Sequence, residues 1–189
     1  MNHIRSLFVI FILSSILFSC TPEIKVKSED VWHKSIMATF FYVGEPASEE
    51  NAFIANDDSA FDEMWVEHYG GIDDPENRNG YYPKTFVPKE NPFYFALPYS
   101  DMSYKNKWIA VRYKENVCYA QWEDVGPYET DDYEYVFEFK SPRNQFGMKA
   151  GLDLSPAMRD CLKMEDNDYV DWKFVDKVPE GPWKEIVTR

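Results

Sequence analysis

The segment AGLDLSPAMRD, residues 150–160, carries an acidic side chain that could do chemistry. Side chains of an extended segment alternate between two faces, so Leu152 and Leu154 should point one way and Asp153 the other. The Ser-Pro pair that follows supplies a helix N-cap and a first helical residue. A carboxyl group held between a strand and a helix start is mounted rigidly enough to act as an acid. The alternative is a surface aspartate that only assists helix capping.

A second acid, Asp124, opens the turn EDVGPY, residues 123–128, which ends in Tyr128. This residue could act together with Asp153 if both side chains entered one groove. Aspartate before a Gly-Pro turn also commonly accepts hydrogen bonds from nearby backbone N–H groups. The sequence leaves both roles for Asp124 open.

Other catalytic and metal-binding arrangements find no support in the sequence. Beyond the N-terminal leader the histidines are His33 and His68, and neither has Cys or His partners at metal-ligand spacing. No Ser-His-Asp arrangement can be argued, because the serine before Pro156 is better explained as a cap. We therefore expect no metal site and no cofactor.

Short β-strands are expected to position these residues. Six segments are rich in aromatic or β-branched residues, and several alternate apolar with polar positions: 35–42, 91–99, 107–114, 117–124, 132–139 and 168–175. Helices are expected over 156–164 and 61–69, the second within a long insertion, 43–90, that follows the first strand. Many short strands and few helices predict a small β-barrel rather than a parallel sheet.

The N-terminus reads as an export signal, with Arg5 ahead of an apolar run within residues 1–20. Its ending, Leu-Phe-Ser-Cys, resembles a bacterial lipobox, in which the cysteine, here Cys20, becomes the lipid-bearing first residue of the mature protein. An ordinary secretory signal is the alternative. The polar stretch 21–34 is expected to be a flexible tether, and 35–189 a single domain of about 160 residues.

The composition restricts the kinds of partner. The chain is 44% hydrophobic and 17% aromatic, enough for a core, and its net charge is -13 with a pI near 4.6. Such an acidic protein should bind neither nucleic acid nor anionic lipid head groups. We expect a monomer that meets the membrane through its lipid anchor.

Two cysteines, Cys118 and Cys161, remain once Cys20 is lipidated. An exported pair can form a disulfide. In the predicted barrel one lies on a strand and the other on a helix, and the sequence does not say whether their Cα atoms come within bonding range. Their pairing stays open at this stage.

The two acidic motifs resemble known signatures. EDVGPY followed by GLDLSPAMRD is similar to the pair of motifs in double-psi β-barrels of the rare lipoprotein A and expansin type. The resemblance extends to ALPY (96–99), to MATFFYVG (37–44) and to the closing strand DYVDWKFVD (168–176). It implies a mainly β, six-stranded double-psi β-barrel.

The resemblance also implies site residues. The groove threonine of expansins falls on Thr39, and their two aspartates fall on Asp124 and Asp153. The expansin tyrosine two places after the first aspartate falls on Gly126, although Tyr128 could reach a similar space. The histidine of rare lipoprotein A falls near Tyr94, which departs from that family's pattern.

These relatives act on long polysaccharides, so the resemblance implies aromatic residues that stack on sugar rings. Candidate platforms are Trp122, Tyr128, Tyr94 and Tyr42. Aromatic residues at such positions often belong to a barrel core, and we expect half of these four to be buried.

The resemblance thus implies a lipid-anchored protein of the bacterial cell envelope, at the outer membrane, that binds or cleaves peptidoglycan glycan strands. Three chemistries stay open: a lytic transglycosylase with Asp153 as its acid, an inverting hydrolase that also uses Asp124, and non-hydrolytic loosening as in expansins. From a different class comes a non-catalytic binding or assembly module, in which the insertion 43–90 closes over the groove.

Overall fold

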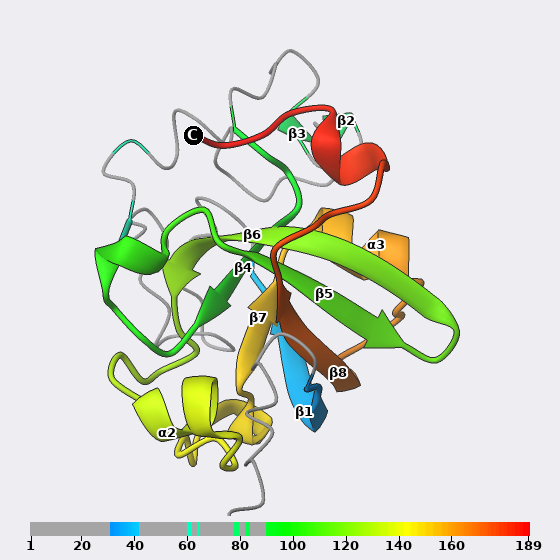
Figure 1. The fold of residues 1–189 in the computed structure, drawn as a ribbon. Helices are drawn as coiled ribbons and strands as arrows, with labels where there is room; N and C mark the ends of the chain where they lie inside the picture. The colour runs from blue at the N-terminus through cyan, green and yellow to red at the C-terminus, as the bar shows by residue number, and fades with distance from the viewer. Residues whose placement is uncertain (1–30, 42–59, 62–63, 65–77, 80–81, 84–89) are drawn as a thin grey trace, which may run out of the picture.

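The computed structural model describes residues 31–41, 60–61, 64, 78–79, 82–83 and 90–189 (Figure 1). Six strands close into one barrel in the order β1-β7-β4-β6-β5-β8. Their bounds are β1 (His33–Phe40), β4 (Tyr94–Leu97), β5 (Trp108–Tyr113), β6 (Asn116–Val125), β7 (Leu152–Leu154) and β8 (Asp168–Val175). The barrel is mixed, because β1 and β7 run parallel, as do β4 and β6, while the other neighbouring pairs are antiparallel. The predicted fold class is confirmed.

Two short α-helices flank the barrel on different sides, α2 (Tyr133–Glu138) and α3 (Pro156–Leu162) (Figure 1). Among the residues that the structure describes, the remaining elements are three 3-10 turns, η3 (Met102–Tyr104), η4 (Gly147–Lys149) and η5 (Pro182–Lys184), and a two-stranded sheet of β2 (Arg78–Asn79) and β3 (Tyr82–Pro83). Helix α3 begins as predicted, because the Ser155 hydroxyl accepts a hydrogen bond from the backbone N–H of Met158 at 3.2 Å and proline is the first helical residue.

One predicted strand is wrong. Residues 132–139 form helix α2, and the sixth barrel strand is β7, the LDL segment that we predicted to be extended but did not count among the six. The alternation of aromatic residues over 133–139 imitates a strand. The helix nevertheless brings Tyr133 and Phe137 together, one turn apart, with ring centroids separated by 4.9 Å, and it buries Tyr135 against the barrel.

The domain starts earlier than predicted. Strand β1 begins at His33, so the last two residues of the predicted tether belong to the barrel. The His33 ring is buried and stacks on Trp172 with centroids 3.9 Å apart, and burial lowers its pKa to about 4. Most of the predicted insertion, including most of the predicted helix over 61–69, lies outside the described residues, as do Cys20 and the leader.

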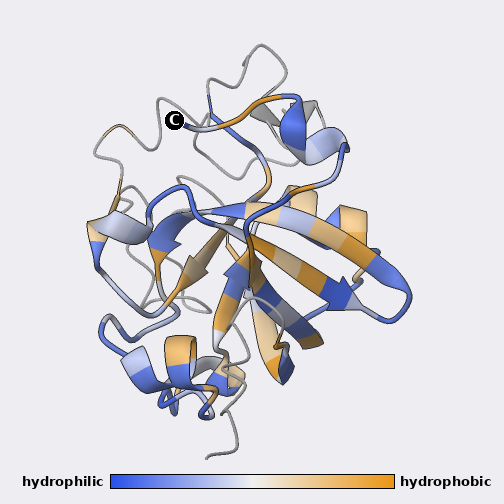
Figure 2. Cartoon of the chain, viewed as in Figure 1, coloured by the Kyte–Doolittle hydropathy of each residue, from blue (hydrophilic) through white to orange (hydrophobic). Residues whose placement is uncertain are grey.

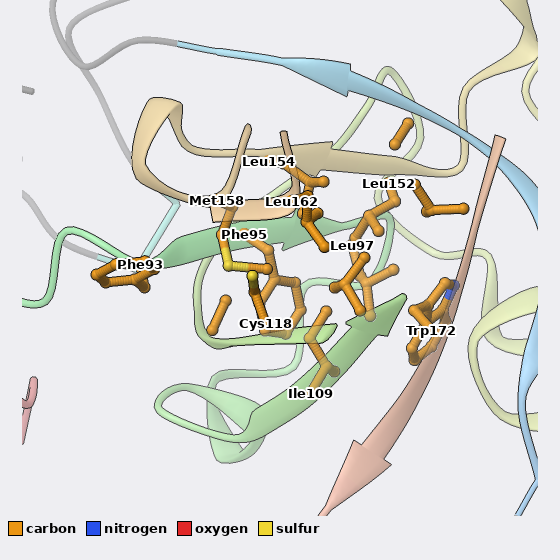
Figure 3. Close-up of a cluster of buried hydrophobic side chains, with 14 of the residues drawn as sticks. Phe93, Phe95, Leu97, Ile109, Cys118, Leu152, Leu154, Met158, Leu162 and Trp172 are labelled. Carbon is orange, nitrogen blue, oxygen red and sulfur yellow. The ribbon is translucent and has the colours of Figure 1, made fainter. Parts of the chain in front are cut away.

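The barrel interior is filled by side chains from every wall (Figure 3). Leu152 and Leu154 point into it beside Phe95 and Leu97 of β4, as the alternation in the sequence predicted. Polar residues interrupt the apolar ones along the strands (Figure 2). Each fully buried leucine or phenylalanine contributes about 1.5 to 3 kcal/mol, so this interior fixes the strands that carry the polar residues described below.

A disulfide joins Cys118 of β6 to Cys161 of α3, with the two Cα atoms 6.3 Å apart. It ties the helix that follows β7 to β6, which β4 separates from β7 in the barrel. The structure therefore closes the question that the sequence left open, and the bond points to an extracytoplasmic protein, since disulfides persist in oxidising compartments. No helix within the described part of the chain is long and apolar enough to cross a membrane.

Candidate functional site

Residues from four adjacent strands form a row on one face of the barrel wall. Thr39 of β1 is paired with Asp153 of β7. Ala96 of β4 is paired with Asp153 on one side and with Asp124 of β6 on the other. Directly paired residues point to the same face of a sheet, so these side chains share one surface. The structure thus brings together the three polar residues that the sequence predicted for the groove.

Ala96 sets the spacing between the two acids. It separates Asp124 from Asp153 by two strand spacings, about 9 to 10 Å between Cα atoms. Ala96 is buried, whereas the threonine and both aspartates are half-buried. The row therefore has a small residue at its middle and polar groups on either side.

Asp153 is held in place from both directions along the chain. Its neighbours Leu152 and Leu154 are buried in the core. Ser155 caps helix α3, and its hydroxyl also accepts a hydrogen bond from the backbone N–H of Tyr94 at 3.3 Å, which locks β7 to β4. The carboxyl group therefore cannot shift without disturbing the core, the helix start and the neighbouring strand.

The pKa of Asp153 is raised to about 6. Removal of the carboxyl group from water is the largest cause, because burial disfavours its charged form. The Thr39 hydroxyl donates a hydrogen bond to Oδ1 and lowers the pKa, while the charge of Asp124 raises it with the smallest of the three effects. Asp153 therefore keeps its proton up to about pH 6, where an ordinary aspartate has lost it.

Asp124 is held by its backbone and its side chain. Its carbonyl oxygen accepts a hydrogen bond from the indole N–H of Trp122 at 2.7 Å, and its Oδ1 accepts one from the backbone N–H of Ala60 at 2.9 Å. Phe61, which follows Ala60 in the chain, is buried, and its ring centroid lies 6.3 Å from that of Trp122. Lys105 donates to the Phe61 carbonyl oxygen at 2.9 Å. Two residues of the insertion therefore dock beside Asp124.

The turn after β6 passes beside Asp153. A Cβ added at Gly126 would lie 3.8 Å from Asp153 Oδ2 and 3.8 Å from the backbone nitrogen of Tyr128. The φ angle of Gly126 is +155°, a conformation that favours glycine. Two residues further along this turn is Tyr128, which is 49% exposed.

Two of the predicted platform residues are not available to a ligand. Trp122 is 0% exposed and packs against Phe95 in the core, and Tyr94 is 4% exposed. For these two residues the prediction of sugar stacking is wrong, because both rings are covered by protein. Tyr42 lies outside the described residues, and Tyr128 is the predicted platform residue that the structure leaves exposed.

Sequence reasoning missed two contributors to this surface. Ala60 acts through its backbone N–H, and no property of its side chain could have marked it. Phe146 is 68% exposed, and its ring centroid is 6.0 Å from that of Tyr128. The glycine after Phe146 is compatible with a tight loop, but it was not singled out in the sequence, and nothing in the sequence indicates which residue that loop approaches.

The structure offers no metal centre in the described part of the chain, where no three His, Cys, Asp or Glu side chains come together to hold an ion. The His33 ring is buried in the core.

A separate cavity of about 260 Å³ opens elsewhere on the barrel. It is lined by Tyr104, Lys107, Trp108, Phe137, Phe174, Val175 and Asp176. Neither Asp153 nor any other member of the polar row lines this cavity. It offers mainly aromatic surface and a single carboxyl group, that of Asp176, so the row with its two aspartates remains the stronger candidate for chemistry.

The row can supply one proton near neutral pH. Asp153 is a candidate general acid, Thr39 its hydrogen-bond donor, and Asp124 a nearby negative charge held by the insertion. No protein-family model and no curated protein matches the chain. Its function must therefore be argued from the site.

Proposed function

We propose that the protein is a lipid-anchored, extracytoplasmic relative of the rare lipoprotein A and expansin double-psi β-barrels that cleaves peptidoglycan glycan strands as a lytic transglycosylase. The observation that carries the proposal is the Thr39–Asp153 pair, in which a half-buried carboxyl group with a pKa raised to about 6 accepts a hydrogen bond from a neighbouring strand. Asp153 is the acid of the reaction.

A one-acid mechanism agrees with the state of the two carboxyl groups. Asp153 protonates the glycosidic oxygen as the bond to the departing sugar breaks, and its carboxylate then takes the proton from a hydroxyl of the sugar that remains. That hydroxyl attacks the anomeric carbon, so the product is an internal anhydro sugar. An inverting hydrolase would need a second carboxylate as base for water. Asp124 suits that role less, because the backbone of Ala60 already holds its Oδ1.

The substrate class follows from the surface beside the acid. Half-buried hydroxyl and carboxyl groups can bond to sugar hydroxyls, and the exposed Tyr128 ring next to Gly126 can lie against the apolar face of a sugar. The acidic charge of the chain, -13, argues against a polyanionic nucleic acid as substrate. We propose a monomer that acts on cell-wall glycan.

The proposed location is the periplasmic face of the bacterial outer membrane, reached through the lipobox-like ending at Cys20. The disulfide between Cys118 and Cys161 supports an oxidising compartment. Labelled fatty acid should enter the wild-type protein and not the Cys20→Ala variant, and only the wild type should partition into detergent-rich phases. Absence of label from the wild type would rule out the anchor.

The proposed activity is tested with the intact chain, purified in mild detergent, and with isolated peptidoglycan glycan strands. Mass spectrometry should detect products that end in an anhydro sugar. Asp153→Asn keeps the shape of the side chain and removes its proton, so it should lower the rate at least about a hundredfold while the fold is retained. Products that have taken up water instead would point to hydrolysis, and a fully active variant would exclude Asp153 as the acid.

A second candidate is a non-catalytic binding or assembly module. The observation that favours it is the docking of residues 60 and 61 beside Asp124, which covers part of the row with the protein's own chain. In that case wild type and Asp153→Asn should both leave glycan strands uncut and bind them equally well. Ala60→Pro, which removes the N–H donor to Asp124, should then change binding without producing cleavage.

A further inference from the structure

Two exposed aromatic rings stand side by side next to the row. Tyr128 is 49% exposed and Phe146 is 68% exposed, and their ring centroids are 6.0 Å apart with the planes inclined by 41°. Single exposed apolar residues are ordinary on protein surfaces, but adjoining ones mark places where something binds.

The two loops that carry these rings are clamped together. The Arg143 guanidinium, three residues before Phe146, pairs with Glu129 at 2.8 Å and also with Asp131. The backbone N–H of Arg143 donates to Asp132 Oδ2 at 2.7 Å. The loop after β6 and the loop before β7 are therefore joined by three contacts at Arg143.

The loop of Phe146 is also braced from within. Asn144 is buried, its Nδ2 donates to the carbonyl oxygen of Ala150 at 2.9 Å, and its Oδ1 accepts the backbone N–H of Phe146 at 2.7 Å. A Cβ on Gly147 would lie 2.4 Å from the Tyr128 ring, so the ring can rest on this loop only because residue 147 has no side chain. The exposed position of Phe146 is built into the structure and does not result from a loose loop.

The turn that carries Tyr128 starts beside the proposed acid. A Cβ added at Gly126, two residues before Tyr128, would lie 3.8 Å from Asp153 Oδ2. A chain molecule bound at Asp153 can therefore continue along this turn toward Tyr128 and Phe146.

We propose that Tyr128 and Phe146 form an aromatic platform that binds sugar rings of the same glycan strand, beyond the unit at which Asp153 acts. This inference rests on the proposed function and makes it more specific, because it requires a substrate long enough to reach Phe146. A sugar ring fits because its C–H face can cover an aromatic ring while its hydroxyls reach the polar groups around it. The carboxylates of Glu129 and Asp131 nearby disfavour an anionic ligand.

The test compares long glycan strands with short fragments of the same glycan, using the intact chain. Phe146→Ala should weaken binding of long strands about five- to tenfold, the effect expected for the loss of one stacked ring, and should leave binding of the shortest fragments unchanged. Phe146→Tyr should restore binding. Gly147→Ala, which displaces the Tyr128 ring and removes no aromatic residue, should weaken binding to a similar extent.

Val117→Ala is the matched control, because Val117 is exposed and apolar but lies at the other end of β6 from Asp124. It should bind long strands like the wild type and, like both Phe146 variants, melt at a similar temperature, whereas Gly147→Ala should melt lower because Gly147 has a φ of +43°. If the wild type cleaves or binds long strands and Phe146→Ala binds them with the same affinity, the platform is refuted and the proposed function stands. If the wild type binds no glycan, both are refuted, whereas insertion of Phe146 into neutral lipid vesicles would refute the platform alone.

Discussion

The hydroxyl of Thr39 donates a hydrogen bond to the carboxyl group of Asp153, which lies 114 residues further along the chain. The parallel pairing of β1 with β7 creates this contact. It favours the charged form of Asp153, against the burial that favours the neutral form. The balance between the two sets the pH at which the acid holds its proton.

Thr39→Val should therefore raise the pKa of Asp153 further. Valine has nearly the shape of threonine but no donor, and the loss of one hydrogen bond to the charged form should raise the pKa by about one pH unit. The measurement is a titration of the carboxyl group by carbon NMR, together with the pH profile of glycan cleavage. Thr39→Ser keeps the donor and should titrate like the wild type. A valine variant with an unchanged titration would show that the hydrogen bond does not act on the acid.

The raised pKa also predicts how stability depends on pH. Because the pKa of Asp153 is about 6 in the folded protein and lies near 3.8 when unfolded, the folded state holds the proton more tightly. The folded protein is therefore favoured below about pH 4, and this advantage is lost as the pH rises through 6. The buried His33 has the opposite effect, since its pKa is lowered to about 4 and its contribution is lost as the pH falls below 6.5.

Comparison of wild type with Asp153→Asn separates the two effects. The histidine is common to both proteins, so the difference in melting temperature between them reports Asp153. The variant should gain stability relative to the wild type as the pH rises from 4 to 7, because asparagine pays no cost for ionisation. A difference that stays constant over this range would mean that Asp153 titrates as an ordinary exposed aspartate.

The fold could be predicted from the sequence wherever the spacing of apolar residues, or a capping signal, matched only one kind of element. The closing strand has the bounds predicted for it, Asp168–Val175, and helix α3 starts at Pro156 as its Ser-Pro signal indicates. Over residues 132–139 the alternation of aromatic residues predicted a strand wrongly. In such a pattern every second aromatic residue is four positions away, which is also one turn of a helix. Tertiary packing favours the helix in this segment, because α2 buries Tyr135 against Trp172. The indole N–H of Trp172 donates to the Tyr135 hydroxyl at 2.9 Å.

The candidate site was predictable in its acids but not in its aromatic residues. The alternation of side chains correctly predicted that Asp153 points away from Leu152 and Leu154. It could not tell that β6 is covered on both faces, with Trp122 in the core and Gln121 hydrogen-bonded to Thr188 near the C-terminus. Exposure of an aromatic residue depends on what distant segments cover, and a local pattern carries no information about them.

The disulfide should contribute strongly to stability. Cys118 and Cys161 are 43 residues apart, and closing a loop of that length should stabilise the fold by about 4 kcal/mol in the chain-entropy model. Replacement of both cysteines by alanine should lower the free energy of unfolding by about that amount, measured by urea denaturation. The wild type treated with reductant is the matched control and should lose a similar amount. Two free thiols in unreduced protein taken from the envelope would contradict the pairing.

The last prediction separates one-acid from two-acid chemistry. Asp124→Asn keeps an oxygen that can accept the Ala60 N–H, so the insertion should stay docked, and only the negative charge is lost. If Asp153 works alone, this variant should retain more than about a tenth of the wild-type rate, whereas Asp153→Asn loses at least about a hundredfold. The charge of Asp124 raises the pKa of Asp153, so its removal should also move the pH optimum downward. Rates are measured on the same glycan strands over pH 4 to 8. An inverting hydrolase gives a different result, because both substitutions then abolish cleavage to a similar degree and the optimum cannot be followed in either variant.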